Sequence, residues 1–229
     1  MNEPKIIVAL DGLNEKEVFS LVNTFHSSEC ALKVGKELFL RGGPHMVKTL
    51  IEKGFKIFLD LKFHDIPNTV ARACQAAQGL GVWMLTLHCL GGRKMLEAAV
   101  SALDPSLPAP LLMGVTLLTS FGEKDLHEVG ISQPLKAEVL QLAQLAKESG
   151  LSGVISSPQE VKEIKKAQGP HFLCVTPGIR PAGSALDDQT RIMTPEEALK
   201  EGADYLVIGR PITQAKEPQE ALKEILHSL

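Results

Sequence analysis

A lysine flanked by acidic residues is the feature of this sequence with the clearest chemical meaning. It lies in the stretch FKIFLDLKFHD, which contains Asp60, Lys62 and Asp65. Side chains alternate along a strand, so Asp60 and Lys62 should share one face and Leu59 and Leu61 the other. We predict that the charged face points inward and the leucine face packs on helices. Asp65 follows on a loop, so the lysine is expected to lie between two carboxylates.

This arrangement favours one kind of chemistry over others. A lysine between carboxylates keeps its proton, because nearby opposite charge favours the charged form. Such a lysine is a poor Schiff-base nucleophile but a good electrostatic stabiliser and proton donor for a carbanion. The alternative is a structural salt bridge, with Asp65 near a helix N-terminus. Buried ion pairs add little net stability, so that role alone is a weak reason for the pattern.

Two further charged residues belong to apolar runs near the start of the chain. Asp11 follows the run 6–10, where an aspartate before Gly12 is also an ordinary turn residue. Lys33 lies inside the run CALKVG, and burying an ammonium without a partner is costly. For Lys33 a functional role and a lysine that extends its charged end to solvent are equally compatible with the sequence.

Two glycine-containing segments predict a phosphate site. Arg180 lies in VTPGIRP, which is followed by a long loop to Gln189, and Gly209 and Arg210 lie in VIGRP. Loops after the last two strands of an eight-stranded α/β barrel commonly bind phosphate. Glycine lets backbone N–H groups approach the ligand, and arginine supplies a charge-assisted pair. The alternative is ordinary turn glycines and solvated arginines.

The elements that must hold these residues alternate along the chain. Eight apolar runs of strand length lie at 6–10, 31–34, 55–61, 82–87, 111–118, 153–156, 172–175 and 205–208. Helical patterns lie at 15–26, 44–53, 67–79, 93–103, 135–149, 158–166, 194–200 and 218–229. Eight strand–helix repeats predict an α/β fold, a TIM (β/α)₈ barrel in which residues 1–229 form a single domain. A doubly wound open sheet is the structural alternative, but such a sheet is expected to carry a GxGxxG motif near its start, and this sequence has none.

Composition excludes several classes of function. The 229 residues carry a net charge of −3 without a basic run, so we expect no nucleic-acid or membrane partner. No apolar stretch approaches the length of a membrane span, and no signal peptide is recognisable. Four scattered cysteines suggest buried free thiols in a reducing compartment, hence a cytoplasmic protein. With no metal cluster and no lysine suited to a pyridoxal phosphate Schiff base, we expect no cofactor.

These motifs together resemble a known family. The stretch DLKFHDIPNT at 60–69 resembles the DxKxxD signature of orotidine 5′-phosphate decarboxylase, in its bacterial form. The resemblance covers nearly the whole chain and includes ALD at 9–11, LKVG at 32–35, VTLLTS at 115–120, TPGIRP at 176–181 and VIGRP at 207–211. DxKxxD alone is shared by related sugar-phosphate enzymes, whereas the ordered set is highly specific.

The resemblance implies a role for each matching residue. The substrate is orotidine 5′-phosphate, the product is UMP, and Lys62 protonates C6 of the pyrimidine as CO₂ leaves. Lys33, Asp60, Lys62 and Asp65 form an alternating charge network, in which Asp65 enters the active site of the neighbouring subunit of a homodimer. Asp11 and Lys33 hold the ribose hydroxyls, with Thr69 contributing from the partner. Thr119 contacts the pyrimidine, and the phosphate-side positions are Arg180, Gln189, Gly209 and Arg210.

Two alternative functions stay open at this point. One is a Mg²⁺-dependent sugar-phosphate decarboxylase or aldolase of the same barrel group, which resembles this chain at DxKxxD. Such enzymes bind the cation through a carboxylate near the end of the second strand, where Lys33 would repel it. The other is a catalytically silent nucleotide-binding module, which would keep the phosphate loops but would not need Lys62 between two aspartates.

Overall fold

Each of the eight predicted apolar runs contains a strand, although the run 111–118 is a strand only as far as Val115. A computed structural model describes residues 3–181 and 193–229. The strands are β1 (Ile6–Ala9), β2 (Cys30–Gly35), β3 (Ile57–Phe63), β4 (Met84–His88), β5 (Leu111–Val115), β6 (Gly153–Ile155), β7 (Leu173–Thr176) and β8 (Tyr205–Ile208). Most are near-continuous apolar sequences, as expected for parallel strands covered on both faces.

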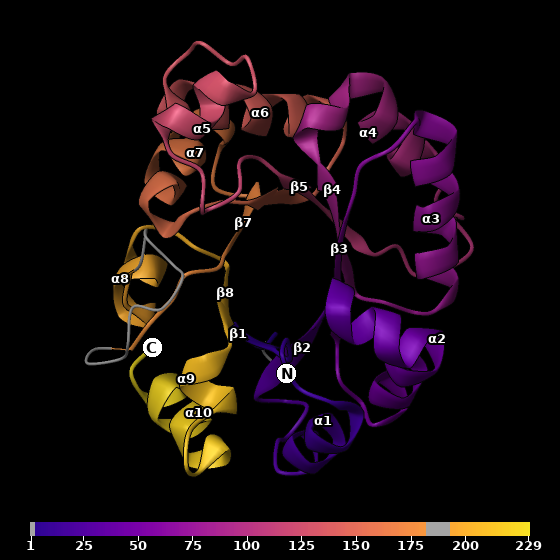
Figure 1. Cartoon of the computed structure of the whole chain (residues 1–229), viewed down its shortest axis with the longest axis vertical. Helices are drawn as coiled ribbons and strands as arrows, with labels where there is room; N and C mark the ends of the chain where they lie inside the picture. The colour runs from indigo at the N-terminus through magenta and orange to yellow at the C-terminus, as the bar shows by residue number, and fades with distance from the viewer. Residues whose placement is uncertain (1–2, 182–192) are drawn as a thin grey trace.

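The strands close into a parallel barrel. They pair in chain order, and β1 completes the ring by pairing with β8 from Ile6↔Leu206 to Val8↔Ile208. Figure 1 looks along the barrel and shows the strands as an inner ring enclosed by helices. The predicted TIM barrel is therefore confirmed, and the open-sheet alternative is wrong.

The helices follow the strands and cover the outside of the barrel. They are α1 (Glu15–Val22), α2 (Lys36–Glu52), α3 (Pro67–Gly79), α4 (Gly92–Ser101), α5 (Glu123–Glu128), α6 (Leu135–Glu148), α7 (Val161–Gln168), α8 (Pro195–Lys200), α9 (Arg210–Thr213) and α10 (Pro218–His227). Short 3₁₀ turns, η1 (Cys89–Gly91) and η2 (Pro158–Glu160), precede α4 and α7.

Two predicted helices needed new bounds, and two short helices were missed. The helix predicted at 44–53 is the second half of α2, which begins at Lys36. Its two halves meet at a kink at Gly43, which has φ 56°. The predicted helix 15–26 ends at Val22, and α5 and α9 were not predicted. These two helices have six and four residues, too few for a helical period to appear in the sequence.

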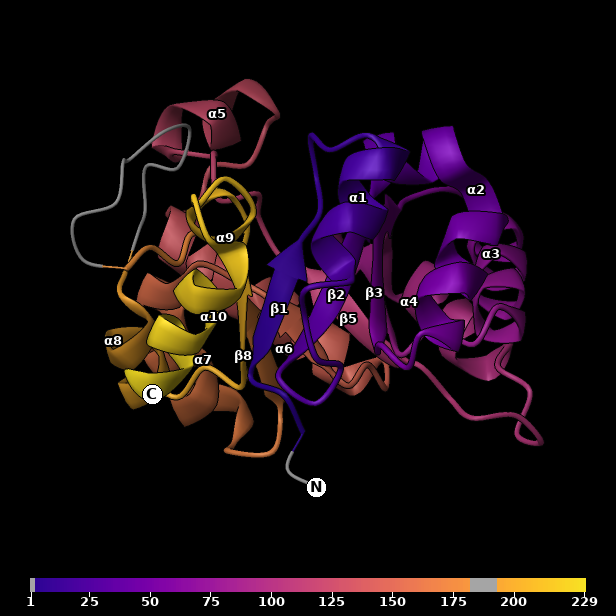
Figure 2. The same ribbon diagram turned by 90° about the horizontal axis from the view of Figure 1, so that it is seen from below.

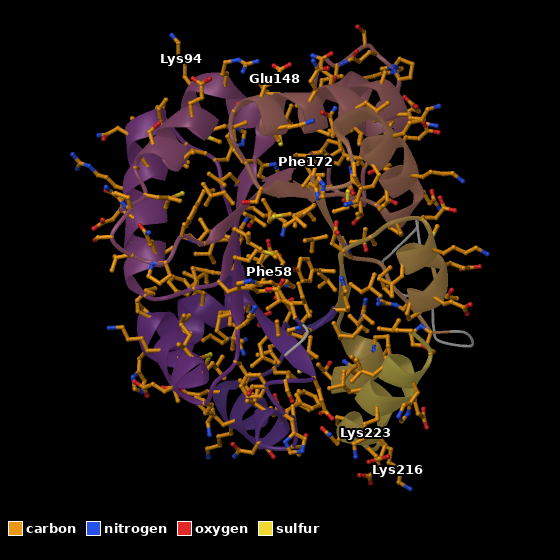
Figure 3. The ribbon with its side chains drawn as sticks, turned by 180° about the vertical axis from the view of Figure 1, so that it is seen from behind. Phe58, Lys94, Glu148, Phe172, Lys216 and Lys223 are labelled. Carbon is orange, nitrogen blue, oxygen red and sulfur yellow. The ribbon has the colours of Figure 1, made fainter. Side chains whose placement is uncertain are left out.

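The barrel separates two layers of apolar packing. Side chains on the outer strand faces pack against the helices, and Leu59 belongs to this layer. A smaller cluster fills the barrel and consists of Ile7, Ala31, Phe58, Met84, Met113, Val115, Ile155, Val175, Tyr205 and Val207. Figure 3 shows Phe58 near the middle of the ring, with Lys94, Lys216 and Lys223 at its periphery. The packed interior leaves room for a ligand at one mouth of the barrel.

Parallel pairing brings the carboxyl ends of all eight strands to that mouth. In Figure 2 the β1 arrow points toward the side that carries α5 and α9, away from the N-terminus. Catalytic residues of such barrels lie at this end. Within residues 3–181 and 193–229, no helix has the length and apolar character needed to cross a membrane.

Candidate active site

A cavity of about 460 Å³ lies at the carboxyl ends of the strands, within the usual size range of small-molecule sites. Eight of the predicted site residues line it, from six different strands or strand ends: Asp11, Lys33, Asp60, Lys62, Thr119, Arg180, Gly209 and Arg210. The barrel therefore brings together residues that are up to 199 positions apart in the sequence (Asp11 to Arg210).

Four alternating charges form a row along one wall of the cavity. The Lys33 ammonium pairs with the Asp11 carboxylate and lies 3.5 Å from Oδ2 of Asp60. Asp60 in turn accepts hydrogen bonds from Nζ of Lys62, 2.8 Å from each carboxylate oxygen. The Lys33 and Asp60 side chains are about nine-tenths buried, whereas the Lys62 side chain is 26% exposed. The row thus ends on an ammonium group that a ligand can reach.

The shared face of Asp60 and Lys62 is confirmed, but simple strand alternation does not produce it. Lys62 has φ 52°, the left-handed region, and the pairing of β3 with β4 shifts register between Leu59 and Phe63. Among the described non-glycine residues, Lys62 alone has a positive φ. Such backbone conformations are strained and persist only where their surroundings enforce them. The Thr86 hydroxyl, 2.9 Å from the Lys62 backbone nitrogen, accepts its N–H.

Glycine at position 35 makes room for the first ion pair of the row. A Cβ atom there would collide with the Asp11 carboxylate and come within 3.4 Å of the Lys33 Nζ. Gly35 also pairs in register with Asp60, so it lies at the centre of the charged wall. Any side chain at this position would displace Asp11 from Lys33.

The buried carboxylate of Asp60 is held in its charged form by its neighbours. Burial alone would raise the pKa of Asp60, but the positive charges of Lys33 and Lys62 and hydrogen bonds from Lys62 and Thr86 outweigh it. The pKa of Asp60 therefore lies below its usual value. A carboxylate that stays charged beside Lys62 supports the predicted role of that lysine as a fixed positive charge.

The phosphate-side residues converge from the last two strands. Arg180 is buried, Arg210 is half-buried, and both line the cavity together with Gly209. Backbone hydrogen bonds from Arg180 N–H to Met193 O and from Met193 N–H to Gly178 O join the chain on either side of the loop after β7. Gln189, also predicted here, lies outside the described residues.

Asp65 and Thr69 are the predicted site residues that do not line the cavity of their own chain. Both are exposed, and Asp65 accepts the backbone N–H of Ile66 at 2.6 Å. Within the described chain the Lys62 ammonium pairs with Asp60 and not with Asp65. Within one chain Asp60 alone therefore flanks Lys62, and a second carboxylate from Asp65 of a neighbouring subunit stays a prediction.

His88, at the end of β4, is a partly buried histidine next to His64. Its Nδ1 is buried and has no hydrogen-bond partner among the described residues. Its ring centroid lies 5.4 Å from that of His64. Burial, together with the nearby His64 and Lys62, lowers the pKa of His88 to about 4, so its ring is neutral at physiological pH.

Sequence reasoning missed most of the apolar cavity wall and one polar residue next to the charge row. Phe58, Val115, Leu117, Leu118, Ile155 and Val207 line the cavity. Their strand positions are visible in the sequence, but similar residues also fill the barrel interior. Thr86 is buried, and its Oγ1 donates to Oδ1 of Asp60 at 3.0 Å. A threonine in an apolar strand gives no sequence signal of this contact.

The donor set of the cavity does not fit a divalent cation. Oxygen ligands from several carboxylates are what Mg²⁺ requires, but Asp11 and Asp60 both pair with Lys33. In the described part of the chain, no group of three or more His, Cys, Asp or Glu is arranged to hold a metal.

Comparison with known proteins identifies the family. The profile described as "Orotidine 5'-phosphate decarboxylase / HUMPS family" matches residues 4–225. A curated relative from Legionella pneumophila (strain Corby), named orotidine 5′-phosphate decarboxylase, is 54% identical over 227 residues and aligns over 99% of each chain. A relative of the same name from Hydrogenovibrio crunogenus is 53% identical, covering 99% of this chain and 96% of the other.

Solved structures share the same architecture. Orotidine 5′-phosphate decarboxylase from Lactobacillus acidophilus superposes with a TM-score of 0.87 at 39% identity, covering 99% of each chain. An uncharacterised conserved protein from Geobacillus kaustophilus gives a TM-score of 0.86 at 39% identity, over 97% of this chain and 99% of that chain.

The charge row predicts how the pKa of Asp60 responds to a change in its neighbours. Lys33→Met should raise that pKa, because burial of the carboxylate is then opposed mainly by Lys62. A ¹³C NMR titration of protein labelled at aspartate Cγ measures the change.

In the wild type, the stability that Asp60 contributes is present above its usual pKa and is lost as pH falls through its lower folded-state pKa.

The matched control is Lys56→Met, at the opposite end of β3, where the lysine pairs with Glu3 instead. This variant should leave the Asp60 pKa at its wild-type position. An unchanged Asp60 pKa in Lys33→Met would contradict the proposed electrostatic coupling.

Proposed function

The chain belongs to the orotidine 5′-phosphate decarboxylase / HUMPS family, and we propose that its cavity converts orotidine 5′-phosphate to UMP without a metal or cofactor. The reaction is the last step of de novo UMP biosynthesis. Relatives 52–54% identical over nearly the whole chain carry the decarboxylase name. The observation that carries the proposal is the accessible Lys62 ammonium, paired with a buried carboxylate, in the same cavity as Arg180 and Arg210.

The geometry supports a direct decarboxylation. Breaking the bond between C6 and the carboxylate releases CO₂ and leaves its electron pair on a ring carbon that has no electron sink. We assign Lys62 to stabilise this charge and to donate a proton to C6, which gives UMP. Solvent then returns a proton to the lysine. Asp60 keeps the ammonium in place and is itself kept charged by Lys33.

The remaining site residues bind and orient the substrate. We assign Asp11 and Lys33 to the ribose hydroxyls, Thr119 to the pyrimidine, and Gly209 with Arg210 to the phosphate. Arg180 lies on the same side, and Gln189 is proposed to contact the phosphate from the loop after β7. An arginine fork next to a glycine backbone is a suitable phosphate receptor.

Magnitudes indicate that Lys62 does not act alone. Two unit charges about 4 Å apart near a protein surface interact by about 4 kcal/mol, which corresponds to roughly a thousandfold in rate. Enzymes commonly accelerate their reactions by more than about a millionfold over the uncatalysed rate. Binding energy from the remote phosphate must therefore help to order the site around the reacting carbon.

The Mg²⁺-dependent alternative fits the cavity less well. It requires a carboxylate at the end of β2, where this chain has Lys33 already paired with two aspartates. The relatives that match nearly the whole chain carry the decarboxylase name instead. A catalytically silent nucleotide-binding module also finds less support, since it would not need the row of buried charges.

We further propose that the enzyme is a homodimer with shared active sites. Asp65 and Thr69 are exposed in one chain, on the loop and first turn after β3. Large apolar side chains are exposed after three neighbouring strands: Leu40 after β2 (85% exposed), Ile66 after β3 (66%) and Leu90 after β4 (43%). Exposed large apolar side chains after neighbouring strands are typical of a surface that a second subunit covers.

The remaining sequence predictions also stand as proposals. We infer that residues 1–229 act as one domain, since the first and last strands pair with each other. A cytoplasmic location is supported by the four cysteines, which are buried and unpaired. Burial raises the pKa of each thiol to about 12, so none is reactive.

Turnover of orotidine 5′-phosphate, followed by absorbance in the presence of EDTA, tests the activity. The wild type should be active without metal, and Lys62→Ala should lose at least about a thousandfold, because the proton donor and its charge are removed. Lys56→Ala, directly before the same strand and outside the cavity, should keep wild-type kcat. An inactive wild type that binds UMP would favour the silent module, and loss of activity in EDTA would favour the Mg²⁺ enzyme.

Mixing two inactive variants tests the shared site. Lys62→Ala and Asp65→Asn should each be nearly inactive as homodimers. In a mixed dimer one site combines an intact Lys62 with an intact Asp65 from the other chain. Equal mixing after subunit exchange should restore about a quarter of wild-type activity, because about half of the dimers are mixed and each has one intact site. Mixtures that stay inactive, or a monomer by sedimentation, would contradict the shared site.

A further inference from the structure

The backbone at Lys62 needs a specific support. A lysine at φ 52° occupies a region that side chains with a Cβ atom rarely adopt. The ladder between β3 and β4 is interrupted at this point, so regular strand pairing does not hold the residue in place. Something outside β3 must therefore stabilise the conformation that aims this side chain along the charge row.

Thr86 on β4 provides that support through a closed set of hydrogen bonds. Its Oγ1 accepts the Lys62 backbone N–H at 2.9 Å and donates to Oδ1 of Asp60 at 3.0 Å. The loop closes through Asp60, whose two oxygens each accept from Lys62 Nζ at 2.8 Å. One hydroxyl thus links the backbone of Lys62 to the carboxylate that holds its ammonium. Thr86 is 1% exposed.

We propose that Thr86 is a positioning residue for the reaction, acting through Lys62 and Asp60 rather than on the substrate. The inference rests on the proposed decarboxylation, because it concerns where the proton donor of that reaction is held. Thr86 does not line the cavity. Its hydroxyl fixes two things together, the unusual backbone angle of Lys62 and the rotamer of Asp60.

The chemistry of threonine explains why this residue type is required. A hydroxyl is both a donor and an acceptor, so one atom can satisfy the Lys62 N–H and the Asp60 carboxylate. Valine has nearly the same shape and neither capacity. Replacing the hydroxyl by a methyl group would leave the two partners unsupported without opening a cavity. The pKa of Asp60 is consistent with this role. Burial raises that pKa, the charges of Lys33 and Lys62 lower it, and the hydrogen bond from Thr86 helps to lower it further.

The test compares Thr86→Val and Thr86→Ser in steady-state turnover of orotidine 5′-phosphate. Thr86→Val should lower kcat by roughly 10-fold to 100-fold, as expected when a reacting group moves by a fraction of an ångström to 1 Å. The Kd of UMP should stay within about threefold of wild type, because the ribose and phosphate contacts are untouched. The acid limb of the pH profile should move to higher pH, since the Asp60 carboxylate loses a hydrogen bond to its charged form. Thr86→Ser keeps the hydroxyl and should recover most of the lost kcat.

Thr116→Val is the matched control. Thr116 is also buried at the end of a strand, and its hydroxyl donates to the Ile155 carbonyl at 3.2 Å, away from Lys62 and Asp60. This variant should keep wild-type kcat and pH profile. If Thr86→Val does not yield folded protein by circular dichroism, Thr86→Cys takes its place, since a thiol is a weak donor and acceptor.

Two results would overturn the inference. One is wild-type kcat and pH profile in the folded variant without a hydroxyl. The other is an equal loss in Thr86→Val and Thr86→Ser, which would assign the effect to packing. An inactive wild type would instead defeat the proposed function, so the two failures are distinguishable.

Discussion

The placement of one ammonium group depends on a buried carboxylate shared between two lysines. Asp60 lies 2.8 Å from the Nζ of Lys62 and 3.5 Å from that of Lys33, and Lys33 also pairs with Asp11. Removing Lys33 or Asp60 would leave a buried charge without a partner. The free-energy cost of that unpaired charge is far larger than the stability that a buried ion pair contributes. The row is therefore poorly explained by stability alone and well explained by the need to hold the Lys62 ammonium in a fixed position.

The barrel supplies the conditions under which this row can exist. Parallel pairing places Lys33, Asp60 and the loops after β7 and β8 at one mouth, above an apolar interior that includes Phe58. Low polarity beneath the row strengthens its interactions, and we propose that the arginines opposite form a separate anchor for an anionic ligand. Because anchor and ammonium come from opposite sides of a closed ring, their separation is set by the fold rather than by a flexible loop.

Much of the fold and of the site could be predicted from the sequence, for identifiable reasons. Strand length and apolar character predicted all eight strands. The family resemblance implied a charge network of Lys33, Asp60, Lys62 and Asp65, whereas the row in one chain runs from Asp11 through Lys33 and Asp60 to Lys62. The bulge at Lys62 could not be predicted, because it depends on how β3 pairs with β4. The contacts of Thr86 depend on the same pairing. Asp65 is exposed in its own chain, so its predicted place beside Lys62 depends on a neighbouring subunit and stays a prediction.

The most direct measurement of the central assignment follows hydrogen exchange at C6 of UMP in D₂O. By microscopic reversibility, the group that protonates C6 after CO₂ leaves must also remove that hydrogen in the reverse direction. Wild-type protein is predicted to exchange the C6 hydrogen of bound UMP for deuterium, as seen by proton NMR. Lys62→Ala protein saturated with UMP should not. Exchange at the wild-type rate in that variant would show that another group carries the proton and would contradict the account.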